Sequence, residues 1–210
     1  MGIWGNFVYP AIKYFRFRRI QKLTSIYPNL QEMSVLDVGG RPIIWELLDK
    51  NWGIRPQRLV ILNTEEELNS LNNYELVVGD GRNLPYDDNA FDLVFSNSVI
   101  EHVGNNTDQV AFAQECLRVG KNIYIQTPNR WFPIETHLVT LFIHWLPKKW
   151  FNKLSFISIR YLFLLRNPQQ FNDIVSGIDL VDRQQLELFF PQRKIIVERL
   201  FGLAKSFVVI

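Results

Sequence analysis

The hydrophobic pattern along the chain alternates short apolar strands with amphipathic helices from residue 34 onward. Strands are predicted at 34–38, 58–62, 74–78, 91–95 and 122–126, and two closing strands at 194–200 and 206–210. Helices are predicted at about 43–51, 108–118 and 182–190, and Thr64 is expected to cap a further short helix. Because the strands are apolar throughout, both faces of the sheet should be covered. The alternation predicts an α/β fold with a doubly wound sheet.

The chain has 210 residues and is expected to form one domain. Two segments do not follow the alternation. Residues 1–31 are expected to form an N-terminal helical cap, and residues 130–172 a helical insert after the fifth strand. The first five strands and their helices occupy residues 34–129, and a closing helix and two strands occupy residues 173–210.

Candidate site residues follow the strands directly, because ligands of doubly wound sheets bind beyond the carboxyl ends of the strands. The strand ends carry glycine and polar residues: Asp37-Val38-Gly39-Gly40, Asn63, Gly79-Asp80-Gly81-Arg82 and Ser96-Asn97-Ser98. Glycine permits a tight turn and a close approach of the backbone to a ligand. The two adjacent glycines do not form a GxGxxG dinucleotide fingerprint.

The stretch from Gly79 to Val103, GDGRNLPYDDNAFDLVFSNSVIEHV, is the most specific signal in the chain. Together with Leu36-Asp37-Val38-Gly39 it resembles the class I S-adenosylmethionine-dependent methyltransferases, and most closely the small-molecule type that includes quinone-biosynthesis enzymes. Thr127-Pro128-Asn129-Arg130 continues the likeness. The resemblance implies a Rossmann-like seven-stranded sheet of order 3-2-1-4-5-7-6 whose last strand is antiparallel.

The resemblance also implies S-adenosyl-L-methionine as the cofactor and assigns roles to residues. The first glycine loop would pass beside the methionine part, Asp80 would accept a hydrogen bond from the adenine amino group, and the end of the fourth strand would lie near the methyl group. Asn63 occupies the position where the family usually has an acid on the ribose hydroxyls. The implied cofactor-binding residues are Asp37, Gly39, Gly40, Asn63, Asp80, Gly81, Arg82, Ser96 and Asn97.

The expected reaction is methyl transfer to a small-molecule acceptor, amphipathic or lipid-linked in one interpretation. A base is required only when the acceptor is a hydroxyl or another weak acid. His137, His102 and Glu101 are the candidates, although a hydrogen-bonded loop histidine remains the alternative for both histidines. His144, in an apolar stretch, is expected to be structural. The alternative function is a non-catalytic binding module of the same fold, which Asn63 favours because an amide offers no charged pair of acceptors.

The net charge of +2 conceals two differently charged parts. Residues 1–31 and 130–172 together contain 11 basic residues and one acidic residue, whereas the remaining chain contains 12 basic and 20 acidic ones. The same two segments hold 17 aromatic residues. They could form a cap with its own core, a membrane-surface patch or a site for an acidic or phosphorylated acceptor. Nucleic-acid binding is not expected.

Cys116 is the single cysteine, which excludes an intrachain disulfide and a cysteine metal site, and no metal is predicted. A reducing, cytoplasmic location is expected, peripheral to the membrane if the basic segments contact it. No secretory signal is recognised, and the apolar run from Thr136 to Pro147 is too short to cross a bilayer. The sequence predicts neither the acceptor atom nor the oligomeric state.

Overall fold

The computed structural model describes residues 9–64, 74–135, 140–147, 149–150, 153 and 177–210. Seven strands form one sheet in the order β3-β2-β1-β4-β5-β9-β8. Their bounds are β1 Ser34–Val38, β2 Arg58–Asn63, β3 Glu75–Val78, β4 Phe91–Asn97, β5 Gly120–Pro128, β8 Ile195–Leu200 and β9 Leu203–Val209. Because β8 and β9 are the sixth and seventh strands of this sheet, the predicted order 3-2-1-4-5-7-6 is confirmed.

The first five strands run parallel to their neighbours, and β9 runs antiparallel to both β5 and β8. This arrangement confirms the expected antiparallel last strand. It also brings the carboxyl ends of β1 to β5 to one edge of the sheet, where the polar strand ends of the sequence meet.

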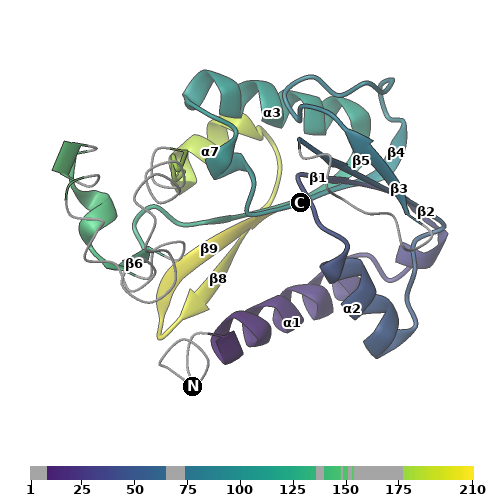
Figure 1. The fold of residues 1–210 in the computed structure, drawn as a ribbon, viewed down its shortest axis with the longest axis horizontal. Coiled ribbons are helices and arrows are strands. Elements are labelled where there is room, and N and C mark those ends of the chain that lie inside the picture. The colour runs from purple at the N-terminus through teal and green to yellow at the C-terminus, as the bar shows by residue number, and fades with distance from the viewer. Residues whose placement is uncertain (1–8, 65–73, 136–139, 148, 151–152, 154–176) are drawn as a thin grey trace.

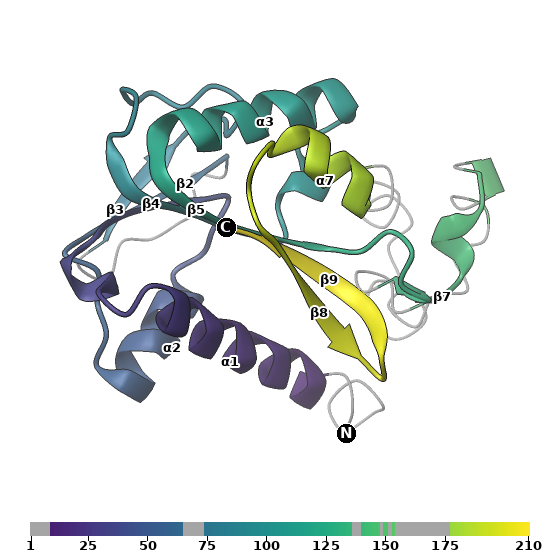
Figure 2. The same ribbon diagram turned by 180° about the vertical axis from the view of Figure 1, so that it is seen from behind.

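Within the described residues, four helices cover the two faces of the sheet (Figure 1). α1 (Tyr9–Ile26) and α2 (Ile43–Trp52) lie on one face, and α3 (Asn106–Val119) and α7 (Arg183–Phe189) lie on the other. The view from behind shows the same two layers (Figure 2). The short helix expected after Thr64 lies outside the described residues.

Local sequence signals set the helix ends. Asn105 caps α3 with a capping box: its side chain accepts from the backbone amides of Thr107 and Asp108, and its own backbone amide donates to the Asp108 carboxylate. Asp182 caps α7 in the same way. Gly53 follows the last residue of α2 as its C-cap and adopts a φ of +65°, a left-handed conformation that glycine tolerates best.

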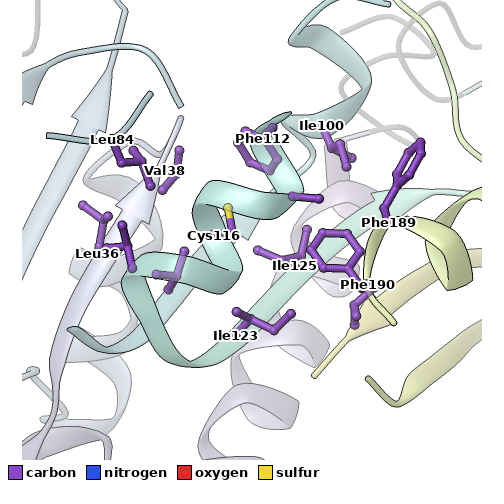
Figure 3. Packing of buried hydrophobic residues seen from close by; sticks show 14 of the residues in the cluster. Leu36, Val38, Leu84, Ile100, Phe112, Cys116, Ile123, Ile125, Phe189 and Phe190 are labelled. Atoms are coloured by element: carbon purple, nitrogen blue, oxygen red, sulfur yellow. The ribbon is translucent and has the colours of Figure 1, made fainter. Parts of the chain in front are cut away.

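Apolar side chains form a separate core on each face. In the core beneath α3 and α7, Phe112 and Cys116 of α3 belong to the same cluster as Phe189 and Phe190, together with apolar residues of the strands (Figure 3). The core beneath α1 and α2 contains Trp45 and the strand residues below it. Cys116 is fully buried, and its burial raises the pKa of the thiol well above the usual range. It is therefore a small core residue.

The insert after β5 contains a feature that the pattern did not predict. β6 (Ile134–Glu135) and β7 (Thr140–Leu141) form a two-stranded antiparallel ladder, followed by a 3-10 turn at Ile143–Trp145. Most of the expected helical insert at 130–172 lies outside the described residues. Within the described parts of the chain, no helix is both long and apolar enough to cross a membrane.

Candidate functional site

A cavity of about 380 Å³ lies at the carboxyl ends of β1, β2 and β3 and beneath the turn after β4. Its volume is within the range of small-molecule sites. Six of the residues proposed from sequence are among its described lining: Gly39, Asn63, Asp80, Gly81, Arg82 and His102. The cavity is thus where the topology of the sheet predicts a ligand.

Glycine is required at two positions around this cavity. Gly39 has a φ of +73°, and a Cβ there would lie 2.5 Å from Cγ1 of Val99. A Cβ on Gly81 would lie 2.8 Å from Cγ1 of Val38. A side chain at either position would have to displace the packed residues on which the cavity rests.

Asp37 lies buried beneath the first loop. Its Oδ2 accepts a hydrogen bond from Nε1 of Trp45 at 2.7 Å, and its Oδ1 has no hydrogen-bond partner among the described residues. Burial raises the pKa of this carboxyl to about 7. A Cβ on Gly40 would overlap the Asp37 carboxylate, so the second glycine accommodates this buried acid.

Asn63 connects two of the strand ends. Its Nδ2 donates to the carbonyl oxygen of Gly40 at 2.9 Å, and its Oδ1 accepts from the amide of Thr64 at 2.8 Å. The side chain therefore fastens the first glycine loop to the end of β2. An acid at this position could not donate the bond to Gly40.

Asp80 is held in its charged form by Arg82. Nη2 of Arg82 lies 2.7 Å from Oδ2 of Asp80, and its Nη1 lies 2.7 Å from Oδ1 of Asp108 on α3. The bonds from Arg82 lower the pKa of Asp80. This chain of charges fixes the loop after β3 against the first turn of α3.

The end of β4 presents its side chains in alternate directions. Ser96 is buried, and its Oγ donates to the carbonyl oxygen of Val38 at 2.9 Å. Asn97 accepts a hydrogen bond from Nη1 of Arg19 at 3.0 Å. Neither is among the described residues of the cavity lining, whereas Ser98, with a φ of +57°, is.

The candidate bases lie in different surroundings. His102, at the end of the 3-10 turn Ile100–His102, lines the cavity. Glu101 is fully buried, and its Oε2 accepts from Oγ1 of Thr127 at 3.0 Å, so it faces β5. His137 lies outside the described residues. His144, which was expected to be structural, stands in the 3-10 turn of the insert beside Trp145, with ring centroids 5.8 Å apart.

Two arginines at the strand ends were not proposed from sequence. Arg41 lines the cavity and could have been found, because it follows the second glycine directly. Arg19 of α1 reaches Asn97 at the end of β4 across 78 residues of sequence. That contact depends on how α1 packs on the sheet, so the local sequence around Arg19 does not predict it.

A family model described as a methyltransferase domain matches residues 52–122, from the end of α2 into β5. These residues include the loop after β3 and all of β4, and they stand in a seven-stranded sheet of the order 3-2-1-4-5-7-6. This match and the order of the sheet agree with the resemblance to the class I S-adenosylmethionine-dependent methyltransferases. A search of curated proteins finds no match to this chain.

Solved structures share the fold at low sequence identity. The PH0226 protein from Pyrococcus horikoshii is 15% identical with a TM-score of 0.57, and the match covers 94% of this chain and 89% of that chain. A SAM-dependent methyltransferase from Archaeoglobus fulgidus is 14% identical with a TM-score of 0.57, covering 97% and 99%. PigF with SAH is 15% identical with a TM-score of 0.53, covering 99% and 67%.

The cavity fits S-adenosylmethionine, the cofactor that the resemblance implies. The cavity has room for a nucleoside-sized group, and Gly39, Gly81 and the ionised carboxylate of Asp80 are among its lining. A carboxylate oxygen has lone pairs to accept further bonds from an amino group or a hydroxyl. Arg41 supplies a positive charge within the same lining.

Proposed function

We propose that this protein transfers a methyl group from S-adenosylmethionine to a small amphipathic acceptor, such as a lipid-linked molecule with a polar head. The observation that carries this proposal is an exposed aromatic cluster just beyond the carboxyl end of β5. Trp131 is 58% exposed, and its ring lies 6.4 Å from that of Trp145, which in turn lies 4.9 Å from Phe142. Exposed aromatic groups of this kind are stabilised by an apolar ligand.

The cluster is held in place by backbone contacts. Nε1 of Trp145 donates to the carbonyl oxygen of Arg130 at 3.0 Å, and the amide of Phe142 donates to the carbonyl oxygen of Pro133 at 2.9 Å. The guanidinium of Arg130 lies 5.9 Å from the ring centroid of Trp131. Apolar rings next to a fixed cation are suited to a molecule with an apolar body and an anionic or polar head.

When bound, S-adenosylmethionine supplies a methyl group that its sulfonium already activates. The chain has to hold the acceptor in line with that methyl group and exclude water. In this proposal Gly39 and Asp80 bind the cofactor, with Asn63 holding the loop that carries Gly39. His102 takes the proton from an acceptor hydroxyl, because it is the one candidate base among the described residues of the cavity lining.

The basic, aromatic segments 1–31 and 130–172 are proposed to bring the enzyme to a membrane surface from the cytoplasm. Among their described residues, Nζ of Lys153 lies 5.9 Å from the ring centroid of Trp150, which is itself exposed. Aromatic rings beside basic side chains are typical of protein surfaces that lie at the headgroup level of a bilayer. An amphipathic acceptor would be reached at such a surface.

The proposal is tested by asking whether a labelled methyl group is recovered in the organic or the aqueous phase after extraction of the reaction. The enzyme is incubated with methyl-labelled S-adenosylmethionine and either a total lipid extract or a lipid-free metabolite extract. We expect label in the organic phase of the first reaction, and a loss of about tenfold or more in Trp131→Ala, because a buried aromatic contributes about 1.5–3 kcal/mol to binding. Trp52→Ala removes an exposed tryptophan of α2 and serves as the matched control. Label that remains in the aqueous phase would indicate a polar acceptor instead.

A further inference from the structure

The hairpin between β8 and β9 ends in a turn whose sequence does not suit its geometry. The ladder closes at Leu200 and Leu203, so Phe201 and Gly202 form a two-residue turn. Their φ angles are +51° and +81°. Two-residue turns with positive φ at both positions strongly favour Asn-Gly or Asp-Gly, because a bulky side chain is strained in the left-handed region. Phenylalanine is thus unexpected at position 201.

The side chain of Phe201 buries almost no surface against the protein that could offset this strain. It is 95% exposed, and Leu203 beside it is 51% exposed. The turn itself is held by Arg199, whose Nη1 donates to the carbonyl oxygen of Gly202 at 2.8 Å. A strained backbone that holds an aromatic ring in solvent at the tip of a hairpin indicates that the ring contacts another molecule.

A groove of about 670 Å³ runs between α1 and the edge strand β8 and reaches this tip. Arg18 and Lys22 of α1 and Arg199 of β8 are among its described lining residues. The acidic side chain in that described lining, Glu198, accepts from Oγ of Ser206 at 2.6 Å and lies 3.4 Å from Nε of Arg19, which is outside the lining. Three cations therefore face the groove, and the carboxylate among them is already engaged.

The tip and the groove lie at one end of the molecule. The β8–β9 hairpin extends to the same side as the insert with β6 and β7, as the two opposite views agree (Figures 1 and 2). That insert carries the exposed rings of Trp131 and Trp150. Apolar tips and basic side chains thus occur on the same side, which is the composition of a surface that faces anionic lipid.

We propose that the β8–β9 hairpin inserts Phe201 into an anionic bilayer, while the groove between α1 and β8 receives a lipid phosphate. A projecting tip cannot enclose a small molecule, which needs a concave site, whereas the plane of a bilayer can receive it. The cations of the groove complement the negative surface of such a bilayer. This inference rests on the proposed membrane contact and names the element that makes it.

The direct test places an environment-sensitive fluorophore on the tip. Cys116 is buried, so a thiol-reactive dye on Phe201→Cys reports the tip alone. We expect the emission to shift to the blue and to be quenched by spin-labelled lipid when phosphatidylcholine vesicles containing phosphatidylglycerol are added. Leu188→Cys, at a 79% exposed position of α7, is the matched control and should not respond. Leu203→Cys offers a second labelling position on the same hairpin if Phe201→Cys does not fold.

Unlabelled variants measure the affinity for the same vesicles by co-sedimentation. Phe201→Ser should weaken binding by about 10- to 100-fold, the effect of leaving one phenylalanine out of an apolar phase, and Leu188→Ser should leave it unchanged. Arg18→Gln and Lys22→Gln should each weaken it by about fivefold, and the loss should shrink as salt is raised.

Three results would overturn the inference: no response of the label at the tip, an equal response to neutral vesicles, or a response to rising protein concentration without vesicles. The last would mean that the tip contacts a second copy of the chain. Titration with S-adenosylhomocysteine and the labelled-methyl assay are run on the same preparations. Normal methyl transfer into lipid without vesicle binding would reject insertion of the β8–β9 hairpin into the bilayer, but it would not contradict the proposed function.

Discussion

At the scale of single residues, the buried carboxyl of Asp37 makes the stability of the fold depend on pH. Its pKa is about 7 in the folded protein because burial disfavours the charge, against an ordinary value of 3.8. The unfolded chain therefore loses this proton at a lower pH than the folded protein does. Between about pH 4 and pH 7 the folded state binds more protons, so stability falls as pH rises and levels off above pH 7.

Replacing the acid by its amide should remove this dependence. Between pH 5 and pH 8 the cofactor-free wild type should lose about 2–3 kcal/mol of unfolding free energy relative to Asp37→Asn. Denaturant unfolding of both proteins at several pH values measures the difference. The test compares how the unfolding free energy of each protein changes with pH, so a pH-independent change in stability caused by the substitution does not affect it. Parallel pH profiles would show that the Asp37 carboxyl titrates normally in the fold.

Asn63 gives a second prediction at this scale, because the family pattern and the contacts of this chain point in opposite directions. In Asn63→Asp a carboxylate oxygen would face the carbonyl oxygen of Gly40 in place of the donor that now lies 2.9 Å from it. We expect a loss of about 1–3 kcal/mol of stability and weaker binding of S-adenosylhomocysteine. Calorimetric titration measures the affinity, and Asn63→Ala, which removes the donor without adding charge, is the control. Tighter binding by Asn63→Asp would mean that the acid takes up the ribose role instead.

At the scale of elements, hydrophobic periodicity predicted those helices and strands whose position depends on the local sequence. The seven main strands, α2, α3 and α7 stand close to their predicted bounds, because apolar runs mark them in the sequence. The β6–β7 ladder escaped prediction. It pairs only two residues of each strand, too few for an alternating pattern to show.

The same distinction explains the site. The strand ends were predictable, but not which side chain of each end turns toward the cavity. Along β4, Ser96 and Asn97 point to opposite sides of the sheet, as successive strand residues do, and the cavity is lined by Ser98 in the turn beyond. The burial of Glu101 against Thr127 likewise depends on how the turn after β4 packs on β5.

At the scale of the whole molecule, cofactor binding and folding are linked because the cavity is assembled from three strand ends and the turn after a fourth. A ligand that binds only the folded state stabilises it by about 2.7 kcal/mol at 100 times its Kd. For a chain of this size, S-adenosylhomocysteine should therefore raise the Tm by about 5–10 °C. Amide exchange should slow in the loop after β1 and in residues 79–82, and remain unchanged in α7.

Two glycine variants separate this linkage from ordinary backbone strain. Gly39 and Gly53 have φ angles of +73° and +65°, so alanine strains the backbone similarly at each. A Cβ on Gly53 would meet nothing within 4 Å, whereas one on Gly39 would lie 2.5 Å from Val99 in the lining of the cavity. Both alanine variants should have a lower Tm without ligand, but only Gly53→Ala should retain the full rise with S-adenosylhomocysteine. An equal rise in both would place the ligand away from the first loop, since a binding site that includes that loop cannot tolerate its displacement.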